Sequence, residues 1–236
     1  MSTSLARVSA KLSLALLVLT FMLWCLVRIM PAQAEMRAPE IVRTATDTAP
    51  PISDPVLARI NDKLATEIEN GLPAQVRECL ARYKSVFRAI EKRSGVPMEL
   101  LVGVATIESG GCSLPKNGPG NITHITLVDD RHRLKAAEFA KTTPQELNEL
   151  ESSFDAVAIT AAVLRDYKRR TDTGLTGIMA YERGPGNLPD DTTTPNRYAR
   201  RVLTAAAFAR RILNKEPIVD SDGIVIHVTA DELPEF

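Results

Sequence analysis

Residues 98–112, MELLVGVATIESGGC, constrain the fold of this chain more than any other stretch. The apolar positions fall on every side of a helix and are Leu100, Leu101, Val102, Val104, Ala105 and Ile107. A helix that is apolar all round is buried all round, so the sequence predicts a central helix here. Pro97 precedes it and suits a first helical position, where its missing N–H costs nothing.

One acidic side chain ends this apolar run. Glu108 is followed by Ser109, Gly110 and Gly111, which should end the helix. A carboxylate at the end of an apolar helix is poorly solvated, and desolvation disfavours its charged form. The electronegative C-terminus of the helix acts in the same direction. We therefore expect the pKa of Glu108 to rise towards the range of a general acid; the alternative is a solvated glutamate that simply ends a helix.

The composition favours helices over sheets. Aromatic residues make up only 5% of the 236 residues, so the core must consist mostly of Leu, Val, Ile and Ala. The length fits one domain with extensions, or two small domains. Lys and Arg together number 29, as do Asp and Glu, so the net charge gives no reason to expect nucleic acid as a partner. The predicted fold class is mainly α.

The N-terminal segment has the pattern of an export signal. Arg7 and Lys11 form a basic region, residues 12–27 are apolar and uncharged, and residues 32–34, AQA, fit the small-x-small cleavage rule. We predict a signal peptide over residues 1–34 and a periplasmic or cell-envelope location. The alternative is an uncleaved inner-membrane anchor, which would then be the chain's contact with a membrane.

The rest of the chain is expected to divide into four parts. Residues 35–53 are rich in Pro, Ala and Thr and are typical of a flexible linker. Residues 54–82 form an N-terminal helical extension and residues 83–215 the main helical domain, because apolar residues recur at helical spacing in both. Residues 216–236 form a tail, in which the turn sequence 220–223, DSDG, predicts a small C-terminal β-hairpin.

The cysteines point to a disulfide. Cys25 lies in the predicted signal peptide, which leaves Cys79 and Cys112. An even pair in an oxidising compartment favours a bond, which would tie a preceding helical segment to the loop just after Glu108. The alternative is two buried free thiols.

The sequence contains no pattern for a metal or a cofactor. His124 lies in a loop-like stretch, where a lone histidine is more often a surface or hydrogen-bonding residue than a catalytic one. No second His or Cys accompanies it at ligand spacing, so we expect no metal site. Gly184-Pro185-Gly186 is not a nucleotide fingerprint, because no strand is expected before it.

Three stretches occur in the order of the motifs of one enzyme family. Residues 107–110, IESG, end the apolar helix; residues 154–167 begin with FD and continue as an alanine-rich helix; and residues 180–186 read AYERGPG. They resemble the catalytic Glu-Ser motif, the scaffold helix and the Ala-Tyr-Asn-Ala-Gly-Pro-Gly motif of the lytic transglycosylases, lysozyme-like enzymes that cleave bacterial peptidoglycan. The resemblance covers about residues 83–213. Tyr198 lies within this part, in the stripe of the terminal helix that we expect to be buried. It implies a lysozyme-like helical domain of the transglycosylase (SLT, goose-type lysozyme) kind.

The resemblance also implies the chemistry and its residues. Glu108 would protonate the oxygen of the β-1,4 bond between N-acetylmuramic acid and N-acetylglucosamine, then accept the proton of the sugar's own C6 hydroxyl, which leaves a 1,6-anhydro sugar. Tyr181 resembles the tyrosine that orients the glutamate or steadies the developing charge, with a core tyrosine as the alternative. Ser109 resembles a residue that binds the acetamido group or the glutamate, with a polar residue that simply ends the helix as the alternative. Gly184 and Gly186 would let the backbone approach the glycan strand.

This sequence departs from the family in the cleft. The counterpart of the family's Gly-Leu-Met-Gln stretch is Gly120 followed by Asn121, Ile122 and Thr123, which become predicted substrate-binding residues. Glu182 replaces the asparagine of the Ala-Tyr-Asn-Ala-Gly-Pro-Gly motif and is also a predicted substrate-binding residue. The expected partner is the peptidoglycan glycan strand, with an envelope assembly as a further candidate. The alternatives are a hydrolytic muramidase, a lysozyme-like glycan-binding or scaffold protein without turnover, and an exported helical domain of unrelated role.

Overall fold

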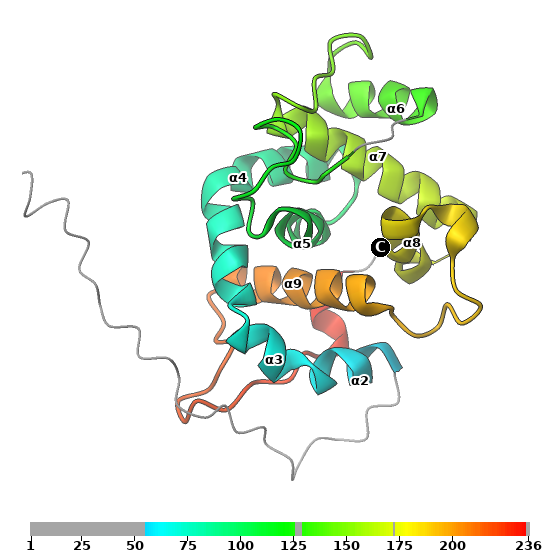
Figure 1. Ribbon diagram of the computed structural model, residues 1–236. Helices are drawn as coiled ribbons and strands as arrows, with labels where there is room; N and C mark the ends of the chain where they lie inside the picture. Colours follow the sequence, from blue (N-terminus) through cyan, green and yellow to red (C-terminus); the bar gives the residue numbers. More distant parts are fainter. Residues whose placement is uncertain (1–54, 126–128, 172, 235–236) are drawn as a thin grey trace, which may run out of the picture. The chain divides into compact units, whose positions relative to one another are not determined.

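The computed structural model describes residues 55–125, 129–171 and 173–234 (Figure 1). Over these residues the chain is mainly helical and forms no strand, which confirms the predicted class. The predicted signal peptide, residues 1–34, and the linker, residues 35–53, lie outside the described residues. Among the helices that are described, none has the length and apolar character needed to cross a membrane.

The helices follow one another with short connections, except for the long loops before α6, α7, α9 and η2. In chain order they are α2 (Pro55–Asp62), α3 (Leu64–Glu69), α4 (Leu72–Ser94), α5 (Met98–Ser109), α6 (Asp130–Ala140), α7 (Ser153–Thr171), α8 (Gly174–Arg183), the 3-10 turn η1 (Pro185–Asn187), α9 (Arg197–Asn214) and the 3-10 turn η2 (Ala230–Glu232).

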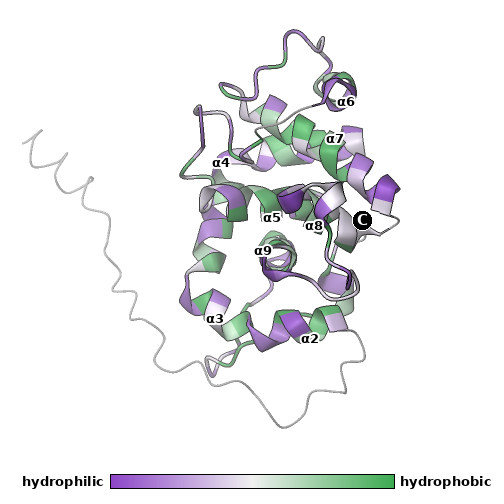
Figure 2. Cartoon of the chain, turned by 45° about the vertical axis from the view of Figure 1, so that its right-hand side comes forward, coloured by the Kyte–Doolittle hydropathy of each residue, from purple (hydrophilic) through white to green (hydrophobic). Residues whose placement is uncertain are grey.

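Helix α5 is the buried centre of the domain, as its sequence predicts. Figure 1 shows it enclosed by α4, α7 and α9, and it packs most extensively against α9. Figure 2 shows apolar colour along α5 and mixed colour along α4 and α7. Gly103 permits this packing, because a Cβ there would lie 2.5 Å from the carbonyl oxygen of Val202 on α9. The α5–α9 contact is therefore a close backbone approach.

The predicted N-terminal extension, residues 54–82, consists of α2, α3 and the first half of α4. Helix α4 is continuous across the predicted boundary between residues 82 and 83. Ile60 and Leu64 belong to the same hydrophobic core as α5. The buried carboxylate of Glu67 on α3 pairs with Arg200 and Arg201 of α9, both at 3.1 Å. The extension is thus packed into the same core as the helices that follow it.

The predicted C-terminal hairpin is not confirmed. Residues 218–226 make one antiparallel bridge, between Val219 and Val225, and no strand. The backbone carbonyls of Ile226 and His227 accept hydrogen bonds from the buried guanidinium of Arg211 on α9, at 2.9 and 2.6 Å. Arg211 also binds Glu232, which belongs to η2. The tail is therefore held by a side chain of α9 where the sequence predicts a longer β-ladder.

Candidate active site

The turn after Glu108 is held tightly against α4. Gly110 ends α5 in the left-handed conformation, with φ 56°. Gly111 also has a positive φ, and a Cβ on it would lie 2.9 Å from the Cα of Gln75 on α4. Cys79 of α4 and Cys112 form a disulfide with a Cα–Cα distance of 5.0 Å, as the cysteine pattern predicts. The position of Glu108 at the helix end is therefore fixed from the side of α4.

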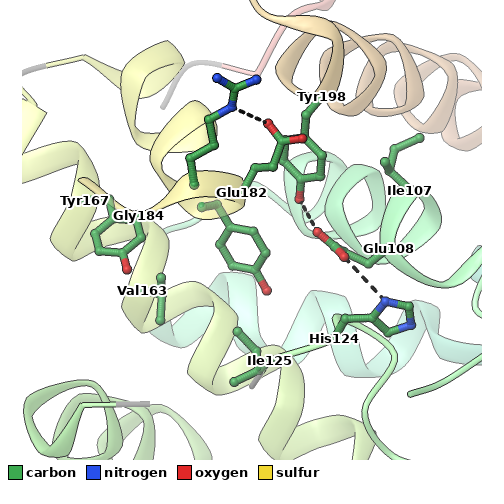
Figure 3. A pocket seen from close by; sticks show the side chains of 11 residues that line it. Ile107, Glu108, His124, Ile125, Val163, Tyr167, Glu182, Gly184 and Tyr198 are labelled. Carbon is green, nitrogen blue, oxygen red and sulfur yellow. Dashed lines mark hydrogen bonds and ion pairs between the residues drawn. The ribbon is translucent and has the colours of Figure 1, made fainter. Parts of the chain in front are cut away.

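A pocket of about 520 Å³ opens beside Glu108 (Figure 3). Its wall comes from the end of α5, the loop before α6, and helices α7, α8 and α9. The lining residues are Ile107, Glu108, His124, Ile125, Val163, Tyr167, Tyr181, Glu182, Arg183, Gly184 and Tyr198. The volume is that of an ordinary small-molecule site. The three motifs that carry the family resemblance each contribute residues to this one wall.

Each carboxyl oxygen of Glu108 faces a different side chain. The hydroxyl of Tyr198 donates a hydrogen bond to Oε1 at 2.7 Å. The Nδ1 atom of His124 lies 3.5 Å from Oε2, on the other side (Figure 3). The side chain of Glu108 is one-fifth exposed and lines the pocket.

The pKa of Glu108 is raised above its ordinary value. Burial is the largest cause, and the nearby charge of Glu182 acts in the same direction. The hydrogen bond from Tyr198 and the charges of His124 and Lys116 oppose the rise. The direction and its main cause are those predicted from the sequence of α5. A carboxyl of this kind can hold a proton at a pH where an exposed glutamate has lost it.

Tyr198, and not the expected Tyr181, makes the hydrogen bond to Glu108. The Tyr181 hydroxyl donates to the carbonyl oxygen of Thr123 at 3.0 Å and lies 3.2 Å from the hydroxyl of Thr160, so it is engaged away from Glu108. Its ring stacks on that of Tyr198, with centroids 6.5 Å apart and planes 7° apart. Burial, and next the charge of Glu108, raise the pKa of both phenols. Both therefore stay neutral, Tyr198 as the donor to Glu108 and Tyr181 as its support.

Five residues predicted to bind substrate do not line the pocket: Gly186 of the α8 motif, and four residues that are engaged inside the protein. Ser109 donates to the carbonyl of Ala105 at 2.6 Å and so stays within α5. The side chain of Asn121 donates to the backbone oxygen of Ile125 and accepts from its N–H, both at 2.9 Å. Ile122 and Thr123 are buried in the core. The two hydrogen bonds of Asn121 with Ile125 brace the loop that carries His124.

Only part of the motif at residues 180–186 lines the pocket. Glu182 and Gly184 line the pocket, as predicted. The carboxylate of Glu182 lies 3.4 Å from Nε of Arg183 and accepts from the side chain of Asn196 at 3.1 Å. Gly184 has a φ of 80°, which glycine adopts without strain. Gly186 falls in η1, outside the pocket wall.

The sequence does not reveal the two side chains that face the carboxyl of Glu108. It places Tyr198 only in the buried stripe of the last helix, and His124 only in a loop. The one signal for Tyr198 is its hydroxyl within a stripe of alanine and aliphatic residues, because a buried tyrosine needs a hydrogen-bond partner. Nothing in the loop sequence distinguishes His124 from a surface histidine.

Within residues 55–125, 129–171 and 173–234, no cluster of three or more His, Cys, Asp or Glu side chains is arranged to hold a metal ion. Comparisons with protein-family models, with curated proteins and with solved structures found no match. A functional assignment for this chain therefore rests on the geometry of the pocket.

Proposed function

We propose that this chain is a peptidoglycan lytic transglycosylase with a lysozyme-like domain. It would cleave the β-1,4 bond between N-acetylmuramic acid and N-acetylglucosamine and leave a 1,6-anhydro end, which makes it a glycosidic-bond lyase. One observation carries the proposal: the carboxyl of Glu108 ends a fully packed helix and faces an open pocket, and its pKa is raised mainly by burial. This is the environment of a general acid.

The proposed reaction needs one carboxyl group. Glu108 donates its proton to the glycosidic oxygen as that oxygen leaves the anomeric carbon. The resulting carboxylate then accepts the proton of the C6 hydroxyl, whose oxygen bonds to the anomeric carbon. Glu108 ends protonated and no water is consumed. Glycosidases that attack with a protein group or with water use a second carboxylate, whereas here the substrate supplies the nucleophile.

The neighbours of Glu108 suit both halves of this cycle. Burial favours the protonated form that the first half needs. The hydrogen bond from Tyr198 to Oε1 favours the carboxylate that the second half needs. The convergence of the α5, α7 and α8 motifs on one wall supports the lysozyme-like identity of the domain. The disulfide between Cys79 and Cys112 supports export to an oxidising envelope compartment, where the glycan strands lie.

A second candidate is a lysozyme-like domain that holds glycan without cutting it. The observation that favours it is the inward placement of Ser109, Asn121 and Thr123, which leaves fewer polar side chains to grip a sugar. Glu182 adds a negative charge where the family has an amide. Such a protein would serve as a binding or scaffold part of an envelope assembly.

Digestion of purified sacculi tests the proposal. The intact protein should release muropeptides with 1,6-anhydro ends, and Glu108→Gln should release none while remaining folded. Glu151→Gln is the matched control, because Glu151 is exposed and outside the pocket. Products one water heavier would indicate a hydrolytic muramidase. Binding to sacculi without any released product would favour the second candidate.

A further inference from the structure

The two carboxyl oxygens of Glu108 have different partners. Oε1 accepts the hydrogen bond of Tyr198, so the proton of the neutral carboxyl belongs on Oε2. Oε2 is the oxygen that faces Nδ1 of His124, 3.5 Å away (Figure 3). The proton that an acid at this site would transfer therefore faces an imidazole.

The surroundings of the His124 ring indicate which of its two nitrogens carries the hydrogen. Nε2 lies 3.0 Å from the carbonyl oxygen of Leu114. A carbonyl oxygen only accepts, so Nε2 carries a hydrogen. In the neutral ring the other nitrogen, Nδ1, is then the acceptor, and it is the one directed at Glu108. Nδ1 is therefore the ring nitrogen that faces the proton of Oε2, 3.5 Å away.

The backbone holds His124 in an unusual conformation. Its φ is 52°, in the left-handed region that non-glycine residues seldom adopt. Asn121, three residues earlier, is completely buried and ties the loop to Ile125. The carbonyl of Thr123 accepts the hydroxyl of Tyr181. A strained residue held on both sides at a pocket wall is typical of a functional position.

We propose that His124 is a positioning residue for Glu108, sharing through Nδ1 the proton that Glu108 carries on Oε2. In the step concerned, the O–H bond of Oε2 breaks and an N–H bond forms at Nδ1, which converts a neutral pair into a carboxylate and an imidazolium. The reverse step restores the neutral pair, and no other bond changes. Its role in turnover rests on the proposed function, since an acid that must next act as a base has to release its proton.

Several other groups around the carboxyl of Glu108 act on its pKa together with His124. Tyr198 of α9 donates to Oε1, and the phenol of Tyr181 on α8 lies behind it. Glu182 of α8 raises the pKa of Glu108, whereas Lys116, in the loop after α5, lowers it. The charge of His124 also lowers the pKa of Glu108, against the effect of burial. Removing this imidazole should therefore leave Glu108 harder to ionise.

His124→Asn is the informative variant. Asparagine is among the residues that best tolerate the left-handed conformation, and it cannot titrate. We expect the alkaline limb of the pH–rate profile for anhydro-muropeptide release to move up by about one pH unit. His227→Asn, in the tail and outside the pocket, should leave the profile unchanged. Lower activity with an unmoved limb would mean that His124 is only structural, and would overturn the proposal.

A titration without substrate separates this inference from the proposed function. The carboxyl carbon of Glu108, identified by its loss in Glu108→Gln, can be followed by NMR against pH in the intact protein and in His124→Asn. A higher Glu108 pKa in the variant supports the pairing, and an unchanged one overturns it. This result stands even if no peptidoglycan is cleaved, in which case the proposed function alone fails.

A further measurement covers the case in which His124→Asn does not fold. The ring nitrogens of His124 can be compared in the intact protein and in Glu108→Gln, since the glutamine has no acidic proton to share. The Nδ1 signal should shift between the two. An identical Nδ1 signal would overturn the proposal.

Discussion

The hydroxyl of Tyr198 on α9 binds the carboxyl of Glu108 at the end of α5, at 2.7 Å and across 90 positions of sequence. This bond joins the two helices that pack most extensively in the domain. It therefore couples the chemistry of the pocket to the packing of the core.

Replacing Tyr198 by phenylalanine removes the donor and leaves the ring. Because the bond favours the carboxylate, its loss should raise the pKa of Glu108 further. A hydrogen bond to a charged group contributes about 1.5–3 kcal/mol, so we expect the proposed activity on sacculi to fall roughly tenfold to hundredfold. Tyr83→Phe on α4, outside the pocket, is the control. Full activity of Tyr198→Phe would show that the hydrogen bond from Tyr198 does not contribute to the reaction.

The raised pKa of Glu108 has a consequence for stability. Below the ordinary value of 4.5, the carboxyl is protonated in both the folded and the unfolded chain and adds no cost. As the pH rises through 4.5 and then through the higher folded pKa, ionisation destabilises the folded state. Glu108→Gln cannot ionise and should unfold at a higher temperature than the intact protein at about pH 8, with little difference at about pH 4. Thermal unfolding at both pH values measures this, and the same difference at both would contradict it.

The disulfide should stabilise the fold and the turn that carries Glu108. Cys79 and Cys112 are 33 positions apart. Closing a loop of that length contributes about 3–4 kcal/mol in the chain-entropy model. Cys79→Ala combined with Cys112→Ala should lower the free energy of unfolding by about that amount, as measured in denaturant. Reduction of the intact protein should have the same effect, and an unchanged midpoint in either experiment would contradict this expectation.

The close approach of α5 and α9 predicts a large effect from one methyl group. A Cβ at Gly103 would meet the carbonyl of Val202 at 2.5 Å and the amide nitrogen of Ala206 at 3.3 Å. We expect Gly103→Ala to destabilise the protein by about 1–3 kcal/mol, because backbone atoms cannot move aside cheaply. Gly186→Ala is the control, because nothing lies within 4 Å of the corresponding Cβ. Denaturant unfolding compares the two variants. Equal midpoints would contradict the prediction, because they would show that α5 and α9 can move apart at little cost.

Several features of this protein are readable from the sequence because their causes are local. Residues 100–107 are apolar on every side of a helix, and burial of α5 is the direct consequence. Glu108 comes at the end of that run, so its desolvation is predictable as well. With Cys25 set aside in the predicted signal peptide, Cys79 and Cys112 are the natural pair, and the structure joins them.

Other features depend on the tertiary structure because they join distant or irregular segments. The partner of Glu108 is decided by how α9 packs on α5, which brings Tyr198 to the carboxyl and leaves Tyr181 bonded elsewhere. The loop residues 121–124 have no periodicity, so only the tertiary structure shows that Asn121 faces the core and His124 faces the pocket. The carbonyls of the tail bind Arg211 of α9, since a guanidinium without a water shell needs acceptors wherever packing supplies them.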